Sequence, residues 1–288
     1  MLRSYGAEAT GWTALVLVGI LVAGCVAPQS GPMLVYSAKS DCSDIRVRDE
    51  GGVRSLYFVE PNLEVRQTSM ILGNPGHLTT PYTRDMFASM LLKHPQKRVL
   101  IVGLGGGAMV RFLNKHFPET SVDAVEIDPE VVKIASKLFG VRSSKRTRII
   151  TEDASVYLQR DKGLYDAIYM DAFLEPGADT DPHGIPQELK TVDFLVSLRG
   201  KLTPGGVVAF NLSEHESTDQ DLQTIARAFP TIYEYRVPDS QNRVVIATGE
   251  TAATPAKDLR AEGREMDSRR SVGFSFENMA DYLSKPAS

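Results

Sequence analysis

Short apolar runs alternate with segments of helical periodicity through most of the chain. The runs are typical of buried strands at residues 99–102, 121–127, 147–151, 165–170 and 206–211. Apolar residues at helical spacing follow them at 109–116, 129–138, 154–160, 192–198 and 219–229. Two more strands are expected at 232–237 and 243–248. This order predicts an α/β fold: a doubly wound, mostly parallel sheet with helices on both faces and an antiparallel pair at one edge.

A different pattern precedes this domain. Residues 44–48 and 54–59 alternate between apolar and polar positions, and the Asp-Glu-Gly-Gly stretch between them is typical of a hairpin turn. A third strand is expected at 64–68, and helical spacing begins at 83–92. We therefore expect a small N-terminal β-hairpin domain at residues 41–80, followed by the α/β domain at 81–249.

The last segment, residues 250–288, is polar and carries clusters of opposite charge. Such a composition predicts a mobile polar tail outside the core. Phe274, Phe276, Met279 and Tyr282 are apolar exceptions that would suit a short docked helix.

The N-terminus carries an apolar run at residues 12–24, shorter than the ~20 residues that a membrane span needs. Arg3 precedes it, and Val-Ala-Gly leads into Cys25, a tetrad that resembles the lipobox of bacterial lipoproteins. We expect a signal peptide at 1–24, a lipidated Cys25 and a flexible tether at 25–40. The protein would then be a membrane-anchored lipoprotein on the periplasmic or cell-surface side. Two alternatives stay open: an uncleaved membrane anchor, and a cytoplasmic protein whose translation starts at Met33.

Composition limits the partners. With 42% hydrophobic and 24% charged residues, the 288-residue chain has the make-up of an ordinary globular protein. A net charge of −4 argues against a nucleic-acid partner, which requires a basic surface. Two cysteines and five scattered histidines leave no pair at ligand spacing, so we expect no metal site.

The first strand of the α/β domain leads into a glycine-rich turn. Gly103, Gly105 and Gly107 let the backbone approach a ligand closely, and Glu126 ends the next strand. A carboxylate at that distance can accept hydrogen bonds from both hydroxyls of a ribose. The turn and the acid predict a site for a nucleoside-containing cofactor, with NAD and S-adenosylmethionine both open. Ala108 in the third glycine place of the dinucleotide fingerprint, and the lack of a Tyr-x-x-x-Lys pair, disfavour an NAD-dependent oxidoreductase.

Two more acids follow later strands. Asp153 and Asp171 stand just after the strands at 147–151 and 165–170. The carboxyl ends of parallel strands meet at one edge of a sheet, where ligands bind. We therefore expect both acids to face the glycine turn, although either could instead cap the helix that follows it.

Residues 44–248 resemble the spermidine synthase-like branch of the S-adenosylmethionine-type transferases. The resemblance rests on the β-domain, the glycine turn, Val-Glu-Ile-Asp-Pro at 125–129, Glu-Asp-Ala at 152–154, the strand at 165–171 and Leu-Thr-Pro-Gly-Gly at 202–206. It implies a Rossmann-like sheet of the class I methyltransferase type, and a donor that is S-adenosylmethionine or its decarboxylated form. The β-domain and Asp171 favour the aminopropyltransferase side of the family. The Gly-Leu-Gly-Gly-Gly turn is also similar to that of some protein methyltransferases.

The resemblance implies a role for each candidate residue. Glu126 would hold the ribose hydroxyls, Asp153 would hold the adenine amino group, and Gln67 would reach the cofactor from the β-domain. Asp171 would lie beside the sulfonium, where it would hold and deprotonate the attacking amine. A carboxylate suits that role because a protonated amine is not a nucleophile. The glycine turn would complete the cofactor site.

The chain departs from the family where amines are bound. Gly106 replaces an aspartate of the glycine turn, and Leu174 replaces a second acid near the catalytic one. Residues 81–85 and 238–240 differ from stretches that carry family side chains for the substrate. The lost acid at Leu174 weakens the case for the dication putrescine.

Arg84 leads to a specific hypothesis. Decarboxylated S-adenosylmethionine ends in an amine alone, whereas S-adenosylmethionine also carries a carboxylate, which arginine binds by bidentate pairing. Arg84 would then face the cofactor tail, near Tyr82, and would select the carboxylated donor for methyl transfer. The alternative is that Arg84 is a surface residue of its helix.

These observations predict a transferase that alkylates an amine or polyamine, with aminopropyl transfer by family likeness. Methyl transfer is one alternative, and a non-catalytic nucleoside-binding lipoprotein is another. Residues 173–187 would cover the site as a lid and would carry His183, a second candidate base. The N-terminal hairpin would allow a homodimer, as in dimers of the family.

Overall fold

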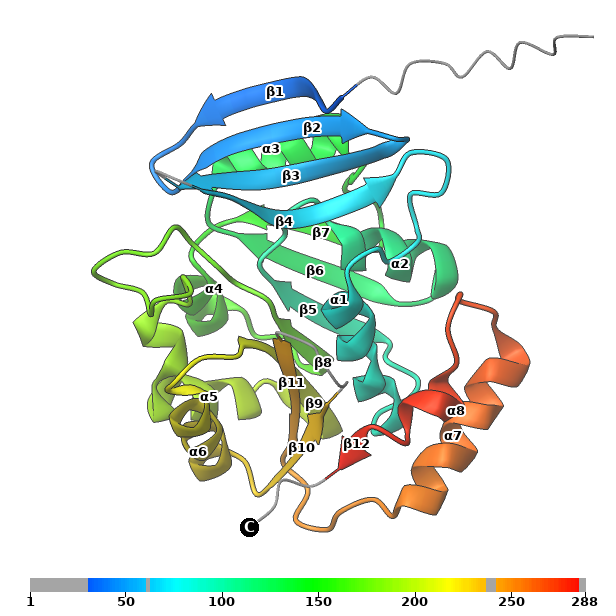
Figure 1. Ribbon diagram of the computed structural model, residues 1–288. Coiled ribbons are helices and arrows are strands. Elements are labelled where there is room, and N and C mark those ends of the chain that lie inside the picture. The colour runs from blue at the N-terminus through cyan, green and yellow to red at the C-terminus, as the bar shows by residue number, and fades with distance from the viewer. Residues whose placement is uncertain (1–30, 61–62, 237–241, 285–288) are drawn as a thin grey trace, which may run out of the picture. The chain divides into compact units, whose positions relative to one another are not determined.

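One sheet of eight strands organises the chain in the computed structural model, which describes residues 31–60, 63–236 and 242–284. Its strands are β5 (Arg98–Val102), β6 (Ser121–Glu126), β7 (Thr147–Thr151), β8 (Tyr165–Met170), β9 (Leu202–Ser213), β10 (Thr231–Tyr235), β11 (Asn242–Thr248) and β12 (Leu283–Ser284). They lie in the order β12-β10-β11-β9-β8-β5-β6-β7 (Figure 1). β5 to β9 are parallel, and β11, β10 and β12 extend the sheet in antiparallel pairing. The predicted α/β architecture is confirmed.

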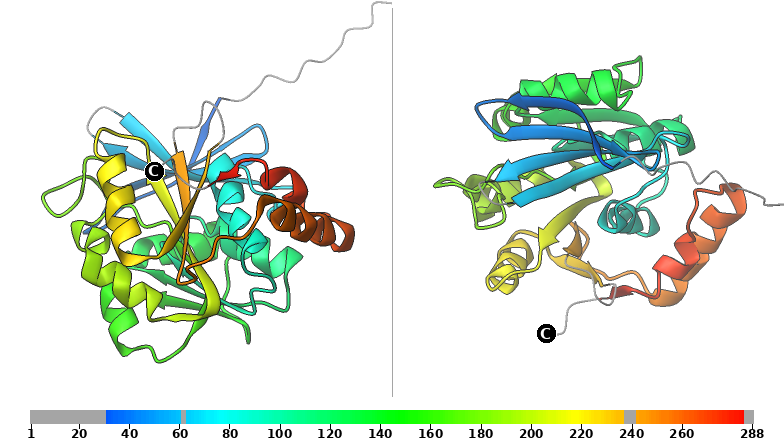
Figure 2. Two further views of the ribbon diagram at one scale, coloured as in Figure 1. Left: turned by 90° about the horizontal axis from the view of Figure 1, so that it is seen from below. Right: turned by 45° about the horizontal axis from the view of Figure 1, so that its top comes forward.

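Helices cover both faces of this sheet (Figure 2). One face carries α1 (Pro81–Asp85), the 3-10 helix η1 (Met86–Leu91), α2 (Ala108–His116), α3 (Pro129–Leu138), α7 (Ala256–Arg269) and α8 (Phe276–Met279). The other carries α4 (Ala154–Arg160), the 3-10 helix η2 (Gln187–Lys190), α5 (Val192–Arg199) and α6 (Thr218–Ala228). The helix predicted at 83–92 is thus divided between α1 and η1.

The strand β5 shows why its apolar run is continuous. Val99 and Ile101 enter the core on the α2 side, whereas Leu100 and Val102 enter the core on the α5 side. Successive side chains of a strand point to opposite faces, so a strand with helices on both sides must be apolar at every position. The carboxyl end of β5 is thereby fixed at the middle of the sheet, where the glycine turn begins.

A second sheet precedes this domain. It is antiparallel, in the order β1 (Met33–Lys39), β2 (Asp44–Glu50), β3 (Val53–Glu60) and β4 (Leu63–Ile71). Ile45, Leu56 and Met70 on its inner face are buried against Ile134 and Phe139 of α3 and its end. Figure 1 shows the sheet in blue and cyan against the green α3. The second sheet is thereby fixed next to the carboxyl end of β6.

The predicted tether at 25–40 overlaps a strand. β1 pairs with β2 along its whole length, from Met33 opposite Asp49 to Lys39 opposite Asp44. A register shift near Tyr36 interrupts the alternation of the strand, which hides it in the sequence pattern. The Tyr36 hydroxyl also donates a 2.6 Å hydrogen bond to Glu130 of α3. Of the predicted tether, the structure describes only residues 31–40.

The polar tail at 250–288 is also ordered where the structure describes it. Leu259 and Met266 of α7 are buried, and so is Phe276 of α8. Asp267 accepts hydrogen bonds from the backbone N–H of Phe276 (2.8 Å) and Glu277 (3.1 Å), and so joins the two helices. The charged clusters form the outward surface of an amphipathic helix. Because only a few of its residues are apolar, the composition of the segment is polar although the helix packs on the core.

Candidate functional site

A pocket of about 610 Å³ opens at the carboxyl ends of β5, β6 and β8, a size suited to a nucleoside-sized ligand. The glycine turn, the ends of the parallel strands, residues of β3 and β4, and the segment 172–189 line it. Gln67, Tyr82, Gly103, Gly105, Gly107, Glu126, Asp153 and Asp171 all belong to this lining. The structure therefore brings together the predicted catalytic acid and all of the predicted cofactor residues except Arg84.

The glycine turn has a backbone that other residues resist. Gly103 (φ 90°), Gly105 (φ 49°) and Gly107 (φ 70°) all lie in the left-handed region. A Cβ on Gly103 would lie 2.1 Å from the carbonyl oxygen of Asp171. The turn can therefore run this close to β8, and its backbone forms the floor of the pocket.

Glu126 is buried at the end of β6 and holds the turn in place. Its Oε2 accepts the backbone N–H of Leu104 at 2.8 Å, and its Oε1 accepts that of Asp128 at 3.0 Å. Burial raises the pKa of the Glu126 carboxyl, and these backbone donors oppose the rise. The carboxylate is thus oriented by the fold before any ligand arrives.

Asp171 follows β8 on the opposite side of the glycine turn. Its Oδ1 accepts a 2.8 Å hydrogen bond from the side-chain amide of Asn211, and its Oδ2 lies 3.3 Å from the Tyr82 hydroxyl. Burial raises the pKa of Asp171 to about 6, against the hydrogen bonds from Asn211 and Tyr82, which lower it. Burial and the nearby Asp171 charge raise the pKa of Tyr82 well above its ordinary value. A carboxyl with such a pKa can take up a proton near neutral pH.

Asp153 and Gln67 lie at the other parts of the pocket wall. Asp153 is the N-cap of α4, where it accepts the backbone N–H of Val156 at 3.0 Å and the hydroxyl of Ser155 at 2.5 Å. The capping alternative is therefore present, together with a place on the wall. The side-chain amide of Gln67 lies 3.4 Å from the carbonyl of Val65 on its own strand.

Arg84 does not line this pocket. Its Nε lies 3.3 Å from Asp85, and its side chain is 40% exposed. Tyr82, two residues earlier, does line the pocket, and residues two apart on a helix do not share a face. The hypothesis that Arg84 faces the cofactor tail is therefore not supported, and the surface alternative describes its position.

Asn211 is a site residue that the sequence pattern did not single out. It is 4% exposed near the end of β9 and contacts Asp171 directly. The signal that could have found it is the one used for the acids, a polar residue at the end of a parallel strand. Only acids at strand ends were considered in the sequence, because an amide cannot act as a base.

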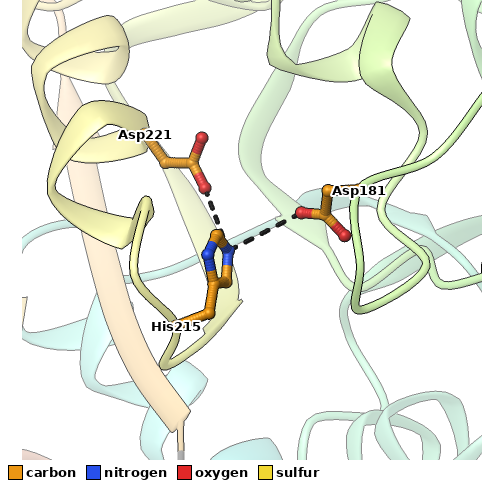
Figure 3. Close-up of side chains that lie close together, drawn as sticks. All are labelled: Asp181, His215 and Asp221. Carbon is orange, nitrogen blue, oxygen red and sulfur yellow. Dashed lines mark ion pairs between the residues drawn. The ribbon is translucent and has the colours of Figure 1, made fainter.

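A second polar cluster lies next to the pocket, at the segment 172–190. Asp181 and Asp221 flank the His215 ring, with Nε2 at 3.7 Å and 3.5 Å from their oxygens (Figure 3). Lys190 bridges the same two carboxylates at 2.9 Å and 2.8 Å. The Nδ1 of His215 accepts the backbone N–H of Ser217 at 3.1 Å, so Nε2 carries the ring hydrogen. With its hydrogen there, Nε2 has no lone pair to offer a metal in this arrangement, so we interpret the cluster as an ionic anchor for the segment 172–190.

Comparisons with known proteins agree with this geometry. Residues 79–248 match the model of the spermine/spermidine synthase domain. The chain belongs to this family. It is 34% identical over 220 residues to the polyamine aminopropyltransferase of Vibrio vulnificus. The aligned region covers 74% of this chain and 71% of that protein. Over 222 residues it is 29% identical to the human eEF1A lysine and N-terminal methyltransferase. This aligned region covers 67% of this chain but only 31% of that protein.

Solved structures show the same fold. Human methyltransferase-like protein 13 in complex with SAH has a TM-score of 0.58 at 28% identity, over 65% of this chain and 93% of that one. A spermidine synthase in complex with the transition-state analogue AdoDATO has a TM-score of 0.64 at 20% identity, over 89% and 86%. The family, the Rossmann-like methyltransferase fold and the transferase class are thereby confirmed. Both groups of relatives imply a donor of the S-adenosylmethionine type.

The predicted localisation is wrong. Two of the matched relatives are named polyamine aminopropyltransferases, and this kinship contradicts an exported lipoprotein. No helix in the described ranges is long and apolar enough to cross a membrane. The interpretation depended on the apolar run at 12–24, on Arg3 before it and on the four residues that end at Cys25. The predicted signal peptide at 1–24 and Cys25 lie outside the described residues.

Proposed function

We propose that this protein transfers an aminopropyl group from decarboxylated S-adenosylmethionine to an amine. The observation that carries the proposal is the charge of the pocket. Its described lining includes six carboxylates and no lysine, arginine or histidine; the acids are Glu126, Glu152, Asp153, Asp171, Asp179 and Glu188. Such a wall attracts a sulfonium and an ammonium, and it offers no cationic side chain for the carboxylate of S-adenosylmethionine.

In this proposal the nucleoside lies across the glycine turn. Glu126 would accept hydrogen bonds from the ribose hydroxyls, and Asp153 would bind the adenine amino group beside α4. Gln67 would close the site from the N-terminal sheet. The backbone supports this arrangement, because the left-handed glycines keep Cβ atoms out of the pocket floor.

The chemistry would centre on Asp171. The donor supplies a carbon bound to a sulfonium, from which a neutral thioether can leave. Asp171 would attract the acceptor as an ammonium and take one of its protons, which frees the nitrogen lone pair to attack that carbon. Tyr82 and Asn211 would hold the carboxylate in line, so that positioning supplies much of the rate.

Methyl transfer to an amine is the second candidate, and one contact favours it. A Cβ on Gly106 would lie 2.3 Å from Cγ2 of Thr68, so this part of the turn has no room for an acid that could hold the donor's amine. The chain also shares 28–29% identity with methyltransferase relatives. Both candidates use Asp171 in the same way, and they differ only in the donor.

Mass spectrometry separates the candidates. The full chain is incubated with either donor and with diamines, polyamines and a peptide that has a free N-terminus. Addition of an aminopropyl group with the decarboxylated donor supports the proposal, and addition of a methyl group supports the second candidate. Tight binding of methylthioadenosine without turnover of either donor would instead support the non-catalytic reading.

We also propose a homodimer that uses the N-terminal sheet. β1 is an edge strand, and Met33 and Leu34 at its start are 60% and 52% exposed. An unpaired edge with apolar side chains favours pairing with another strand. Light scattering of the full chain and of a Leu34→Lys variant tests this, and a wild-type monomer would end the proposal.

A further inference from the structure

Three neighbouring strands carry a chain of side-chain hydrogen bonds that ends on Asp171. Asn242 of β11 donates from Nδ2 to Oδ1 of Asn211 on β9, at 3.0 Å. Asn211 in turn donates from Nδ2 to Oδ1 of Asp171, at 2.8 Å. We call these two hydrogen bonds, Asn242 to Asn211 and Asn211 to Asp171, the relay. Because β11, β9 and β8 are adjacent in the sheet, strand pairing brings the members of the relay together.

The relay has a direction, because an amide has distinct ends. The carbonyl oxygen of Asn211 accepts from Asn242, which leaves only its NH₂ group to face Asp171. The oxygen Oδ1 of Asp171 is therefore always opposite a donor. A proton on Oδ1 would meet an N–H, whereas Oδ2 lies near the Tyr82 hydroxyl, which can either donate or accept.

We propose that Asn211, oriented by Asn242, is a positioning residue that makes Oδ2 of Asp171 the oxygen that takes the proton. The inference rests on the proposed function for its chemical use. A proton passes from the acceptor nitrogen to Oδ2, the nitrogen lone pair forms the new N–C bond, and the C–S electron pair stays on sulfur. Oδ1 keeps its hydrogen bond throughout, so the carboxylate does not rotate during the step.

Charged and titratable neighbours agree with this assignment. Tyr82 of α1 and Glu126 at the end of β6 are the titratable groups that act on Asp171, and neither one bonds to Oδ1. Burial favours the neutral acid, whereas the Asn211 amide favours the carboxylate. If the Asn211 amide were rotated by about 180°, the carboxylate of Asp171 would lose this hydrogen bond. The carbonyl oxygen of Asn211 would then lie against Oδ1 of Asp171.

Asn242→Asp tests the relay without touching Asp171. An aspartate at 242 has no donor, so the Asn211 NH₂ would turn toward it and its carbonyl oxygen would face Asp171. Ser213→Asp is the matched control, because Ser213 lies opposite Asn242 in the pairing of β9 with β11. This variant adds a carboxylate at a similar place but leaves the Asn242–Asn211 hydrogen bond intact. We expect the apparent pKa of Asp171 to rise by about one unit more in Asn242→Asp than in the control.

Two readouts keep this inference separate from the proposed function. Carbon-13 NMR titration of the Asp171 carboxyl in the donor-free chain measures the pKa without any turnover, and the acid limb of kcat/KM should move by the same amount. Equal shifts in Asn242→Asp and Ser213→Asp would mean that charge alone acts, and would overturn the inference. If Asn242→Asp does not fold, Asn211→Leu gives the second test, and an unchanged Asp171 titration there has the same consequence. A wild-type protein that transfers nothing overturns the proposed function only.

Discussion

The methyl carbon of Thr68 occupies the space into which a side chain on Gly106 would extend. A Cβ at position 106 would lie 2.3 Å from Thr68 Cγ2 and 3.1 Å from the ring of Phe139. Thr68 comes from β4, and Phe139 comes from the end of α3. The N-terminal sheet therefore contributes to the shape of the pocket, and the glycine turn cannot change independently of it.

Gly106→Asp should destabilise the protein unless Thr68 is shortened. Overpacking of this kind costs about 1–3 kcal/mol, and Thr68→Ala in the same chain removes the closest atom. We expect thermal denaturation to show a lowered Tm in Gly106→Asp that rises again in the double variant. An equal Tm for the two variants would show that Thr68 does not fill this space. The double variant should also prefer the decarboxylated donor, since an added carboxylate attracts the amine of either donor but repels the carboxylate that S-adenosylmethionine alone carries.

Asp171→Asn should greatly slow transfer and leave nucleoside binding intact. Loss of a general base lowers turnover by about 10²- to 10⁴-fold. Because the pKa of Asp171 is raised to about 6 and the base must be ionised, the wild-type rate should increase as the pH rises through 6 and then level off. Steady-state rates between pH 5 and 8, with calorimetry of methylthioadenosine binding, check both statements. A variant with wild-type turnover would remove Asp171 from the mechanism.

The same carboxyl has a consequence for stability. A folded-state pKa above the unfolded value means that the folded protein binds more protons, so stability is lost as the pH rises from about 4 through 6. Asp171→Asn removes this partly desolvated charge, and it should raise Tm more at pH 8 than at pH 4.5. This result would identify Asp171 as a site where function and stability oppose each other.

Glu126→Gln should weaken nucleoside binding. Glu126 uses its two oxygens to accept the N–H groups of Leu104 and Asp128, and a glutamine keeps only one acceptor. In the proposed function, a charged contact from Glu126 to a ribose would be worth about 1.5–3 kcal/mol, so calorimetry should show affinity for methylthioadenosine reduced by about 10- to 100-fold. Glu152→Gln is the control, because Glu152 also lines the pocket but is paired with Arg160. An unchanged affinity in Glu126→Gln would contradict the ribose role.

Sequence periodicity predicted the central fold well, and for a physical reason. Strands buried on both faces must be apolar throughout, and β5 shows this signal clearly. The pattern failed where tertiary contacts replace it. β1 has a register shift that breaks its alternation, and α7 buries only a few apolar side chains under a charged surface.

The pocket could be predicted from strand ends, but its details could not. Glu126 and Asp171 lie at carboxyl ends of parallel strands, which topology alone brings together. Arg84 was misplaced because a residue type suggested a contact that the helix face does not allow. Asn211 was missed because its role appears only once its partner Asp171 is located on the neighbouring strand.

Lys190→Met should release the segment 172–190, part of which lines the pocket. Lys190 bridges Asp181 and Asp221, and Asp221 belongs to α6. The other oxygen of Asp181 accepts the N–H groups of His183 and Ile185 within the segment. Without the ammonium, two largely buried carboxylates repel each other across the His215 ring. Amide hydrogen exchange in residues 174–189 should accelerate by about tenfold or more, and KM for the donor should rise more than kcat falls.

A matched control separates this effect from the loss of any lysine. Lys133→Met removes an exposed pair with Glu130 on α3, away from the segment. Its exchange pattern in residues 174–189 and its kinetics should equal those of the wild type. If Lys190→Met shows the same exchange as Lys133→Met, the cluster of Asp181, His215 and Asp221 does not anchor the segment. If exchange accelerates but KM stays constant, the segment is anchored there without contributing to donor binding.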